Sequence, residues 1–485
     1  MSASAPAAAP ALARSGPRRR PRLRRRELAL LLAVAVALLV GWASLASTVA
    51  GRPTLGDPTP LLVFCGLVLA AHLALSLWDR RTDQILLPVV ALLMGISLLL
   101  MVRLPQDLVV ATIGPLTLHL AELQLLWIGL SLAIAVVIAV GLRSDVWLRA
   151  YKYSWAAGGI ALLVLVFLFG EVTNGSRLTL RIGPLAGQPS ELLKIILVVF
   201  VAAYLADDRA LLSGRDTKLG PIRLPPLAYL LPMLGMWGIA LAIVIVQRDL
   251  GAALLFYGVF LVLLWVATQR RRDLILGLVL FVVGAVFLDL LFPHVQERVA
   301  IWLDPFATAQ GSGFQVVRGL FALGRGGLVG TGLGAGLPGI GGDPSIPAVH
   351  TDFVFDALGE ELGLAGALAI LALYLVIAER GLRIAAAAGD DFRALLATGL
   401  TLVIVLQAAI IAAGNAKLIP LTGVTLPFVS YGGSSLLANG IALGLLLALG
   451  EGRLEGPPGP RPATRRERLG DAARALGDRV ERAIT

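Results

Sequence analysis

The sequence predicts an all-α, polytopic integral membrane protein with about twelve transmembrane helices. First, 57% of its 485 residues are hydrophobic and only 15% are charged, whereas soluble proteins have roughly a quarter of their residues charged. Second, the apolar residues gather in stretches of roughly 20, the length at which a helix spans a bilayer. Third, the basic connections between these stretches fall on one side of the predicted membrane, as the positive-inside rule requires.

The apolar stretches define the predicted spans in chain order. They cover residues 27–49, 58–78, 84–102, 120–142, 153–170, 189–206, 226–246, 250–268, 273–292, 353–378, 394–414 and 424–449. With the N-terminus inside, every short cluster of arginine and lysine between spans faces the cytoplasm. We therefore expect a multi-pass protein of the cytoplasmic membrane with both termini in the cytoplasm.

The two ends of the chain carry much of its net charge of +10. Residues 1–26 lack an apolar period and are expected to be a disordered basic tail, and residues 451–485 a second basic tail. Runs of arginine can bind nucleic acid, but beside spans they are better explained as anchors near anionic lipid. The expected partners are thus membrane lipids and not nucleic acid. One cysteine and four scattered histidines make a zinc site improbable.

The longest outside connection is a large extracytoplasmic loop, residues 293–352. Many glycines interrupt short apolar pieces in this loop, which predicts short helices lying at the membrane surface. The loop runs into the stretch Pro347–Gly363, where four carboxylates and His350 enter an apolar sequence. Acidic groups at a membrane boundary usually face a polar cavity, a partner charge or a substrate. We interpret Asp352 as the reactive group of a membrane enzyme, and Glu360 and Glu361 as structural ion-pair partners.

Further candidate site residues lie at the outer ends of other spans. Glu191 and Lys194 share a helix face, and a local ion pair explains Glu191 as well as a binding role does. Lys194 lies about a turn inside an apolar span, where a cation needs a partner or an anionic ligand. Arg248 sits in a turn that is either solvated or directed into a polar cavity. Arg298 begins the long loop and can pair with Asp304 or with a phosphate.

The segment 418–435 should break the last span, because it holds two prolines and two adjacent glycines. Broken backbone at membrane depth is tolerated where it lines a cavity. Ser430 and Ser434 would give that cavity a polar wall.

Together these segments resemble the SEDS family of cell-wall synthases, which includes RodA, FtsW and their sporulation relative SpoVE. The matching pieces occur in the family's order: QPSELLK (188–194), QRDLG (247–251), RVAIWLDPF (298–306), GFQVVRGLFALGRGGLVGTGLG (313–334), HTDFVFDALGEELGLAG (350–366) and PLTGVTLPFVSYGGSSL (420–436). The resemblance implies a ten-helix glycosyltransferase core over residues 83–450. Residues 27–82 would then add two N-terminal transmembrane helices, which favour the RodA-like, elongation type.

The resemblance implies a peptidoglycan glycosyltransferase that polymerises lipid II at the outer face of the membrane, during elongation or division, with a class B penicillin-binding transpeptidase. The aspartate of the family's HTDF motif, regarded as catalytic, corresponds to Asp352. The family's loop arginine corresponds to Arg177 and its membrane lysine to Lys194. The chain departs from the family at Ala348, where a glutamate is common, at Leu178 and at Arg248.

The resulting hypothesis makes Asp352 the general base and gives the pyrophosphate of the substrate to Arg177, Lys194 and either Arg248 or Arg298. No cofactor is required by the sequence, and a divalent cation such as Mg²⁺ or Mn²⁺ is compatible with it. Two alternatives remain: a flippase for lipid-linked substrates, and a non-catalytic scaffold that recruits the transpeptidase.

Overall fold

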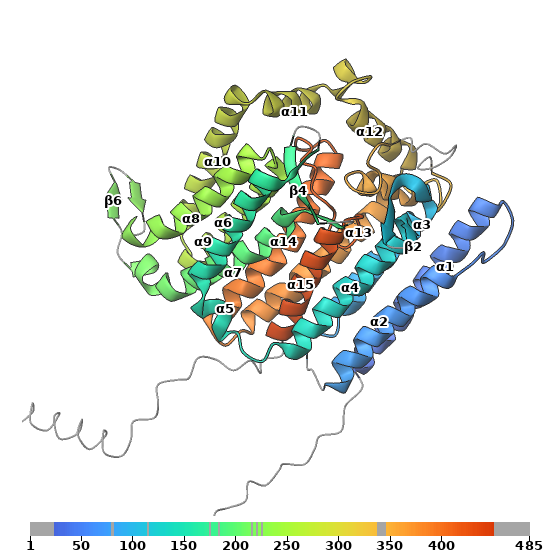
Figure 1. Ribbon diagram of the computed structural model, residues 1–485, viewed down its shortest axis with the longest axis horizontal. Helices are drawn as coiled ribbons and strands as arrows, with labels where there is room; N and C mark the ends of the chain where they lie inside the picture. The colour runs from blue at the N-terminus through green and yellow to red at the C-terminus, as the bar shows by residue number, and fades with distance from the viewer. Residues whose placement is uncertain are drawn as a thin grey trace, which may run out of the picture.

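The computed structural model describes residues 24–78, 82–113, 116–173, 176–182, 185–214, 217–219, 222–224, 227–336 and 346–450. Within these residues it is a bundle of long helices (Figure 1). The predicted tails lie almost wholly outside the described residues. The long helices are α1 (Arg25–Ala50), α2 (Thr59–Leu77), α3 (Leu86–Arg103), α4 (Leu120–Gly141), α6 (Lys152–Phe169), α7 (Pro189–Gly214), α8 (Leu227–Val246), α9 (Leu250–Thr268), α10 (Arg271–Leu291), α13 (Val354–Ala386), α14 (Asp391–Asn415) and α15 (Gly433–Leu449).

Each predicted span coincides with one of these helices. By length and composition, ten helices in the described part of the chain can cross a membrane, and the apolar parts of α8 and α15, Met233–Ile245 and Gly433–Leu449, are shorter. The chain is therefore a mostly helical, multi-pass membrane protein, and the count of twelve stays a prediction. The last span was placed from residue 424, but its helix begins at Gly433, after the irregular segment that the prolines and glycines impose.

The prediction of an all-α fold missed small strands in three of the connections. A hairpin pairs β1 (Val110–Ile113) with β2 (Leu116–His119), three strands pair as β3 (Glu171–Thr173), β4 (Ser176–Ile182) and β5 (Leu185–Gly187), and β6 (Thr217–Leu219) pairs with β7 (Ile222–Leu224), all antiparallel. Six of these strands have only three or four residues, too few for a period of two to stand out, whereas the alternation of polar and apolar residues in β4 was a usable signal that was missed. Pairing still satisfies their backbone groups outside the helices.

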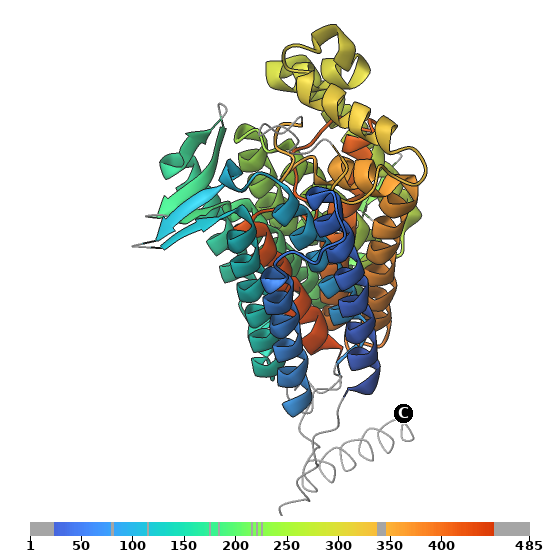
Figure 2. The same ribbon diagram turned by 90° about the vertical axis from the view of Figure 1, so that its right-hand side faces the viewer.

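The long loop contains the short helices expected there, α11 (Pro293–Leu303) and α12 (Phe314–Gly326). They lie at one end of the bundle, the end at which α13 begins (Figure 2). The short elements η1 (Gln106–Leu108), α5 (Val146–Ala150) and η2 (Pro305–Thr308) complete the order. The most buried spans are α3, α7 and α14, whereas most residues of α10 are exposed.

Helix α13 is longer than predicted and breaks at Gly363, whose φ is +69°. The connection after α12 fits into this break: the amide of Leu364 donates to the carbonyl of Gly327 at 2.9 Å. A Cβ at Gly363 would stand 2.2 Å from the backbone nitrogen of Gly330, so a side chain is excluded there. The long loop is thus bonded directly to the helix that follows Asp352.

The N-terminal helices join the bundle through buried charges. Arg24, expected in the disordered tail, is 5% exposed, and its guanidinium donates to the carbonyl of Asp83 at 2.6 Å. It pairs with Glu27 at 2.8 Å, and the ring nitrogen Nδ1 of His72 on α2 lies 2.7 Å from the same carboxylate. Asp83 in turn pairs with Arg380 on α13. Arg24 therefore makes tertiary contacts and does not belong to a disordered tail. Composition could not show this, because it says nothing about where Arg24 lies relative to Asp83 and α13.

We expect Glu27→Ala to destabilise the protein, since it leaves Arg24 buried without its carboxylate. Removing one partner of a buried ion pair costs about 3–5 kcal/mol. Thermal unfolding in detergent, followed by tryptophan fluorescence, should show a lower midpoint. The control Leu32→Ala, on a side chain that is 59% exposed on the same helix, should change the midpoint little. Equal midpoints for Glu27→Ala and the wild type would contradict the expectation.

Candidate functional site

The loop that precedes α13 carries His350 and Asp352, and hydrogen bonds to other elements fix its backbone. Ser430 donates from its hydroxyl to the carbonyl of Thr351 at 2.6 Å, and the amide of Tyr431 donates to the carbonyl of His350 at 2.8 Å. Asn415 of α14 donates to the carbonyl of Asp352 at 3.0 Å. The position of Asp352 is therefore set by α14 and by the irregular segment before α15.

Asp352 is a partly exposed residue. Burial of much of its surroundings raises its pKa to about 6, against the hydroxyl of Thr351 and the positive charge of Arg298, which both lower it. Burial also lowers the pKa of His350, which favours the neutral form of its imidazole. Asp352 can therefore both accept and return a proton near neutral pH.

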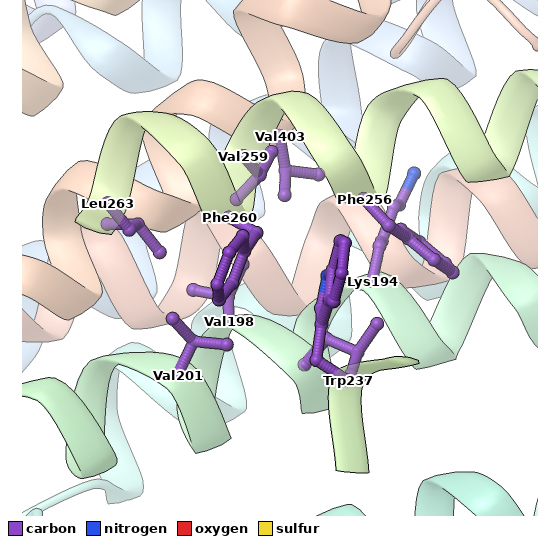
Figure 3. A pocket seen from close by; sticks show the side chains of 10 residues that line it. Lys194, Val198, Val201, Trp237, Phe256, Val259, Phe260, Leu263 and Val403 are labelled. Atoms are coloured by element: carbon purple, nitrogen blue, oxygen red, sulfur yellow. The ribbon is translucent and has the colours of Figure 1, made fainter. Parts of the chain in front are cut away.

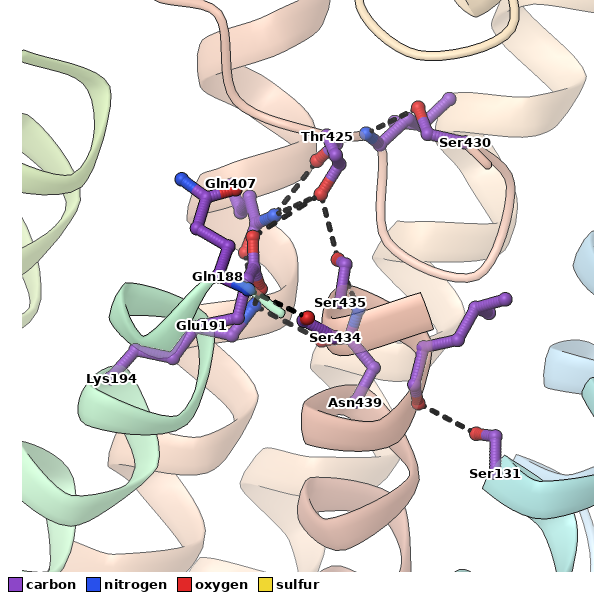
Figure 4. A network of polar contacts seen from close by, with 12 residues as sticks. Ser131, Gln188, Glu191, Lys194, Gln407, Thr425, Ser430, Ser434, Ser435 and Asn439 are labelled. Atoms are coloured by element: carbon purple, nitrogen blue, oxygen red, sulfur yellow. Dashed lines mark hydrogen bonds and ion pairs between the residues drawn. The ribbon is translucent and has the colours of Figure 1, made fainter. Parts of the chain in front are cut away.

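Lys194 lies at the centre of a buried polar cluster (Figure 4). Its side chain is 2% exposed, and Nζ donates to Glu191 Oε2 at 2.5 Å, Gln407 Oε1 at 2.8 Å and Asn439 Oδ1 at 3.4 Å. Because a buried cation needs compensation, these contacts explain how a lysine is held one turn inside α7. We call Glu191, Lys194, Gln407 and Asn439 the Lys194 cluster.

A cleft opens beside this cluster. It is small and is lined by Glu191, Lys194, Asp249, Gln407, Gly423 and Thr425 among others. Gly423 connects the cleft to Asp352, since a Cβ at Gly423 would lie 3.9 Å from Asp352 Oδ2. Its φ of +71° suits glycine. Asp352 and Lys194 therefore both lie close to the segment 422–425.

An apolar cavity lies next to the cleft (Figure 3). Lys194 and Phe256 line both spaces, and the apolar one is otherwise bounded by Trp237, Phe260 and Val403 among others. Lys194 therefore separates a polar space from an apolar one, with its alkyl chain towards the apolar side.

The turn between α8 and α9 contributes charges of both signs. Asp249 caps α9, accepting from the amide of Ala252 at 3.0 Å, and burial raises its pKa, as does the nearby Glu191. Arg248 is exposed, with a φ of +64°. Burial lowers the pKa of His294, as do the charges of Arg248 and Arg298, so both guanidinium groups are near enough to His294 to act on it. Arg298 also donates to the carbonyl of Leu421 at 2.8 Å.

The structure thus brings Glu191 and Lys194 into one cluster and puts Arg298 close enough to act on Asp352. Ser430 is 2% exposed, and the hydroxyl of Ser434 accepts from the amide of Gln188 at 2.9 Å. Both hydroxyls bond backbone groups that shape the site. Arg177 lies in β4, and its side chain is outside the described residues. No group of three or more possible His, Cys, Asp or Glu metal ligands occurs among the described residues.

Sequence reasoning missed several polar residues of this region: Gln407, Asn415 and Asn439. Each carries an amide group inside an otherwise apolar span, which is itself a signal of function or pairing. That signal identifies the residues but not their neighbours, which come from other helices.

Comparison with known proteins identifies relatives of this chain. A family model for the cell cycle proteins FtsW, RodA and SpoVE matches residues 83–453. The peptidoglycan glycosyltransferase RodA of Mycobacterium tuberculosis is 41% identical over 394 residues, which are 81% of this chain and 82% of that protein. A probable peptidoglycan glycosyltransferase FtsW of Geobacter metallireducens is 33% identical over 67% of this chain and 83% of its own length.

Solved structures of similar fold come from the same group of proteins. One similar structure is a chain from a study of the structural coordination of polymerization and crosslinking by a peptidoglycan synthase complex. It superimposes on this chain with a TM-score of 0.60 and 28% sequence identity, and the match covers 77% of this chain and 99% of that one. The crystal structure of the rod shape determining protein RodA of Thermus thermophilus has a TM-score of 0.53 and 26% identity, covering 77% of this chain and 98% of its own.

Ser430→Ala should loosen the loop that holds Asp352. The substitution leaves the carbonyl of Thr351 and the amide of Leu426, which donates to Ser430 Oγ at 2.8 Å, without this partner. Leaving buried groups unpaired costs about 1–3 kcal/mol. Hydrogen exchange measured by mass spectrometry should rise over residues 346–353 but not in α3. Unchanged exchange in that loop would show that the hydroxyl does not hold it.

Proposed function

We propose that this chain, which belongs to the FtsW, RodA and SpoVE family, is a peptidoglycan glycosyltransferase that polymerises lipid II into glycan strands at the outer face of the cytoplasmic membrane. The observation that carries the proposal is the position of Asp352, a partly exposed residue whose carboxyl group lies beside Gly423, which lines the cleft that contains Lys194. The names of the relatives support the reaction class. The RodA-like relatives favour a role in elongation.

The reaction needs a base for the acceptor and stabilisation for the leaving group. The donor sugar carries undecaprenyl pyrophosphate at its anomeric carbon. In the proposed step Asp352 takes the proton of the acceptor's 4-hydroxyl, the oxygen forms the new glycosidic bond, and the bond to pyrophosphate breaks. A base works best when its pKa lies near the operating pH, and burial brings that of Asp352 to about 6.

Pyrophosphate leaves as an anion, so fixed positive charge favours its departure. Lys194 and Arg298 are the described cations next to the cleft and the carboxyl group, and the charge of Arg248, like that of Arg298, acts on His294. We assign pyrophosphate binding to these groups and to Arg177. The proposal requires no resident cofactor. A Mg²⁺ or Mn²⁺ ion bound to the substrate's own phosphates is compatible with it, and a titration with chelator tests that contribution.

We further propose that both termini are cytoplasmic and that the end of the bundle with α11, α12 and Asp352 faces outward. The distribution of basic loops supports this orientation. A class B penicillin-binding transpeptidase is the proposed partner, since one structural relative is a chain of a peptidoglycan synthase complex. Membrane lipids surround the outward apolar side chains of helices such as α10.

The deciding experiment supplies labelled lipid II to the purified protein together with its transpeptidase. We expect glycan strands from the wild type and a loss of at least about 100-fold with Asp352→Asn, since a general base contributes about 10²–10⁴ in rate. The control is Asp304→Asn, an exposed carboxylate that caps η2. Polymer formation at the normal rate by folded Asp352→Asn would refute the site assignment. Lipid translocation in vesicles without any polymer would favour the flippase instead.

The pH profile tests the protonation state. Asp352 acts only when deprotonated, and its pKa is raised to about 6, so kcat/KM should fall as the pH drops through about 6 and reach a plateau above it. Arg298→Gln removes a charge that lowers this pKa, which should move the fall to higher pH. Glu297→Gln, an exposed neighbour on α11, should leave the profile in place. A profile that is flat between pH 5 and 7 would argue against Asp352 as the base.

A further inference from the structure

The residues 426–430 form a turn before α15 in which one residue has a strained backbone. All five residues are buried, and none of them lies in a helix or a strand. Phe428, at the centre of the turn, has a φ of +65° and is 1% exposed. A left-handed backbone is unfavourable for a residue with a bulky side chain, so it persists only where the surrounding structure enforces it. The turn therefore depends on contacts with other elements.

Hydroxyl groups from two helices bond the carbonyl groups on either side of Phe428. Tyr374 of α13 donates to the carbonyl of Pro427 at 2.5 Å, and Ser97 of α3 donates to the carbonyl of Val429 at 2.5 Å. Tyr374 is 2% exposed and Ser97 is 0% exposed. A buried carbonyl group without a partner costs about as much free energy as a lost hydrogen bond. The two hydroxyls therefore satisfy the peptide groups that flank the strained residue.

Gln124 of α4 fixes the direction in which Ser97 donates. Its Nε2 group donates to Ser97 Oγ at 2.7 Å, and its side chain is 0% exposed. A serine hydroxyl has a single hydrogen, and the carbonyl of Val429 can only accept. The hydrogen of Ser97 therefore points to the turn, while the amide of Gln124 supplies the second hydrogen at this oxygen.

The turn is bonded in turn to the loop that carries Asp352. Ser430, its last residue, donates to the carbonyl of Thr351 at 2.6 Å. The amide of Tyr431, the next residue, donates to the carbonyl of His350 at 2.8 Å. These are the two residues that precede Asp352, so a shift of the turn would shift the backbone that places the carboxyl group.

We propose that Tyr374 and Ser97 are positioning residues for the transfer reaction: their hydroxyls hold the strained turn at Phe428, and the turn sets the backbone that carries Asp352. The inference rests on the proposed function, because Asp352 is the base assigned there. Both hydroxyls act through the backbone and take no part in the proton transfer.

Tyr374→Phe and Ser97→Ala each remove one hydroxyl and little else. With labelled lipid II and the transpeptidase present, kcat should fall about tenfold in each variant, as expected for one lost buried hydrogen bond. KM should stay the same, because the Lys194 cluster keeps its contacts. Combining Tyr374→Phe with Ser430→Ala should reduce kcat by less than the product of the two single losses, since both substitutions release the same loop.

Two matched controls remove the same groups elsewhere. Tyr257→Phe takes away a hydroxyl that donates to the carbonyl of Gly277 at 2.6 Å on α10, and Ser131→Ala one that donates to the carbonyl of Leu436 at 2.7 Å on α15. Each control loses a hydrogen bond of the same kind, so it should lose similar thermal stability but retain kcat. Wild-type kcat in Tyr374→Phe and Ser97→Ala, or equal falls in tests and controls, would overturn the proposal.

Hydrogen exchange measured by mass spectrometry tests the hold on the loop without activity. In Tyr374→Phe, exchange should rise over residues 426–431 and 346–353 but not in α9, and in Tyr257→Phe it should not rise in these two segments. Unchanged exchange there in Tyr374→Phe, or independent losses of kcat in the double variant, would also overturn the proposal. Normal polymer formation by Asp352→Asn would instead refute the proposed function.

Discussion

The need to compensate a buried cation determines the arrangement of the site. Lys194 lies on α7 and is 2% exposed, so little water reaches its charge, and its partners come from three helices: Glu191 from α7, Gln407 from α14 and Asn439 from α15. Removing any of them would leave part of the charge unsatisfied, so the three helices must meet at this depth. Gln407 also donates to the carbonyl of Thr425 at 2.8 Å, which brings the irregular segment before α15 to the same place.

The irregular segment before α15 connects the Lys194 cluster to the loop that holds Asp352. Thr425 and Gly423 line the cleft on the side of the lysine, and Ser430 and Tyr431 bond the backbone of the loop before α13. The segment can do this because it is not a helix, which leaves its backbone groups free to pair with other elements. At the other end of the bundle a buried charge again joins separate elements, because Arg24 and Asp83 connect the N-terminal helices to α13.

The sequence predicts what depends on local pattern. Hydropathy locates the helices, and charges in apolar surroundings mark Lys194 and Asp352 as candidates. It does not predict which partners compensate them, because Gln407 and Asn439 are 213 and 245 residues from Lys194 and each resembles an ordinary amide in a span. The contacts of Arg24 could not be predicted for the same reason, since Asp83 lies 59 residues away in the sequence. The short strands were missed for another reason, since segments of three or four residues are too short for a period to be recognised; only β4, with seven largely alternating residues, carried a signal that was overlooked.

The two aspartates at the start of α13 show why a sequence motif alone does not assign roles. Asp352 and Asp356 are four residues apart, so both cannot easily be anionic in the same poorly solvated region. Their surroundings differ: Arg298 and the open side of the cleft favour ionisation of Asp352, whereas Asp356 is enclosed by α12 and α14 without a cation. Environments that separate the protonation states of neighbouring acids give them separate tasks. Of the two, only Asp352 is exposed enough to meet an acceptor hydroxyl, which is why the proposed mechanism assigns the proton transfer to it.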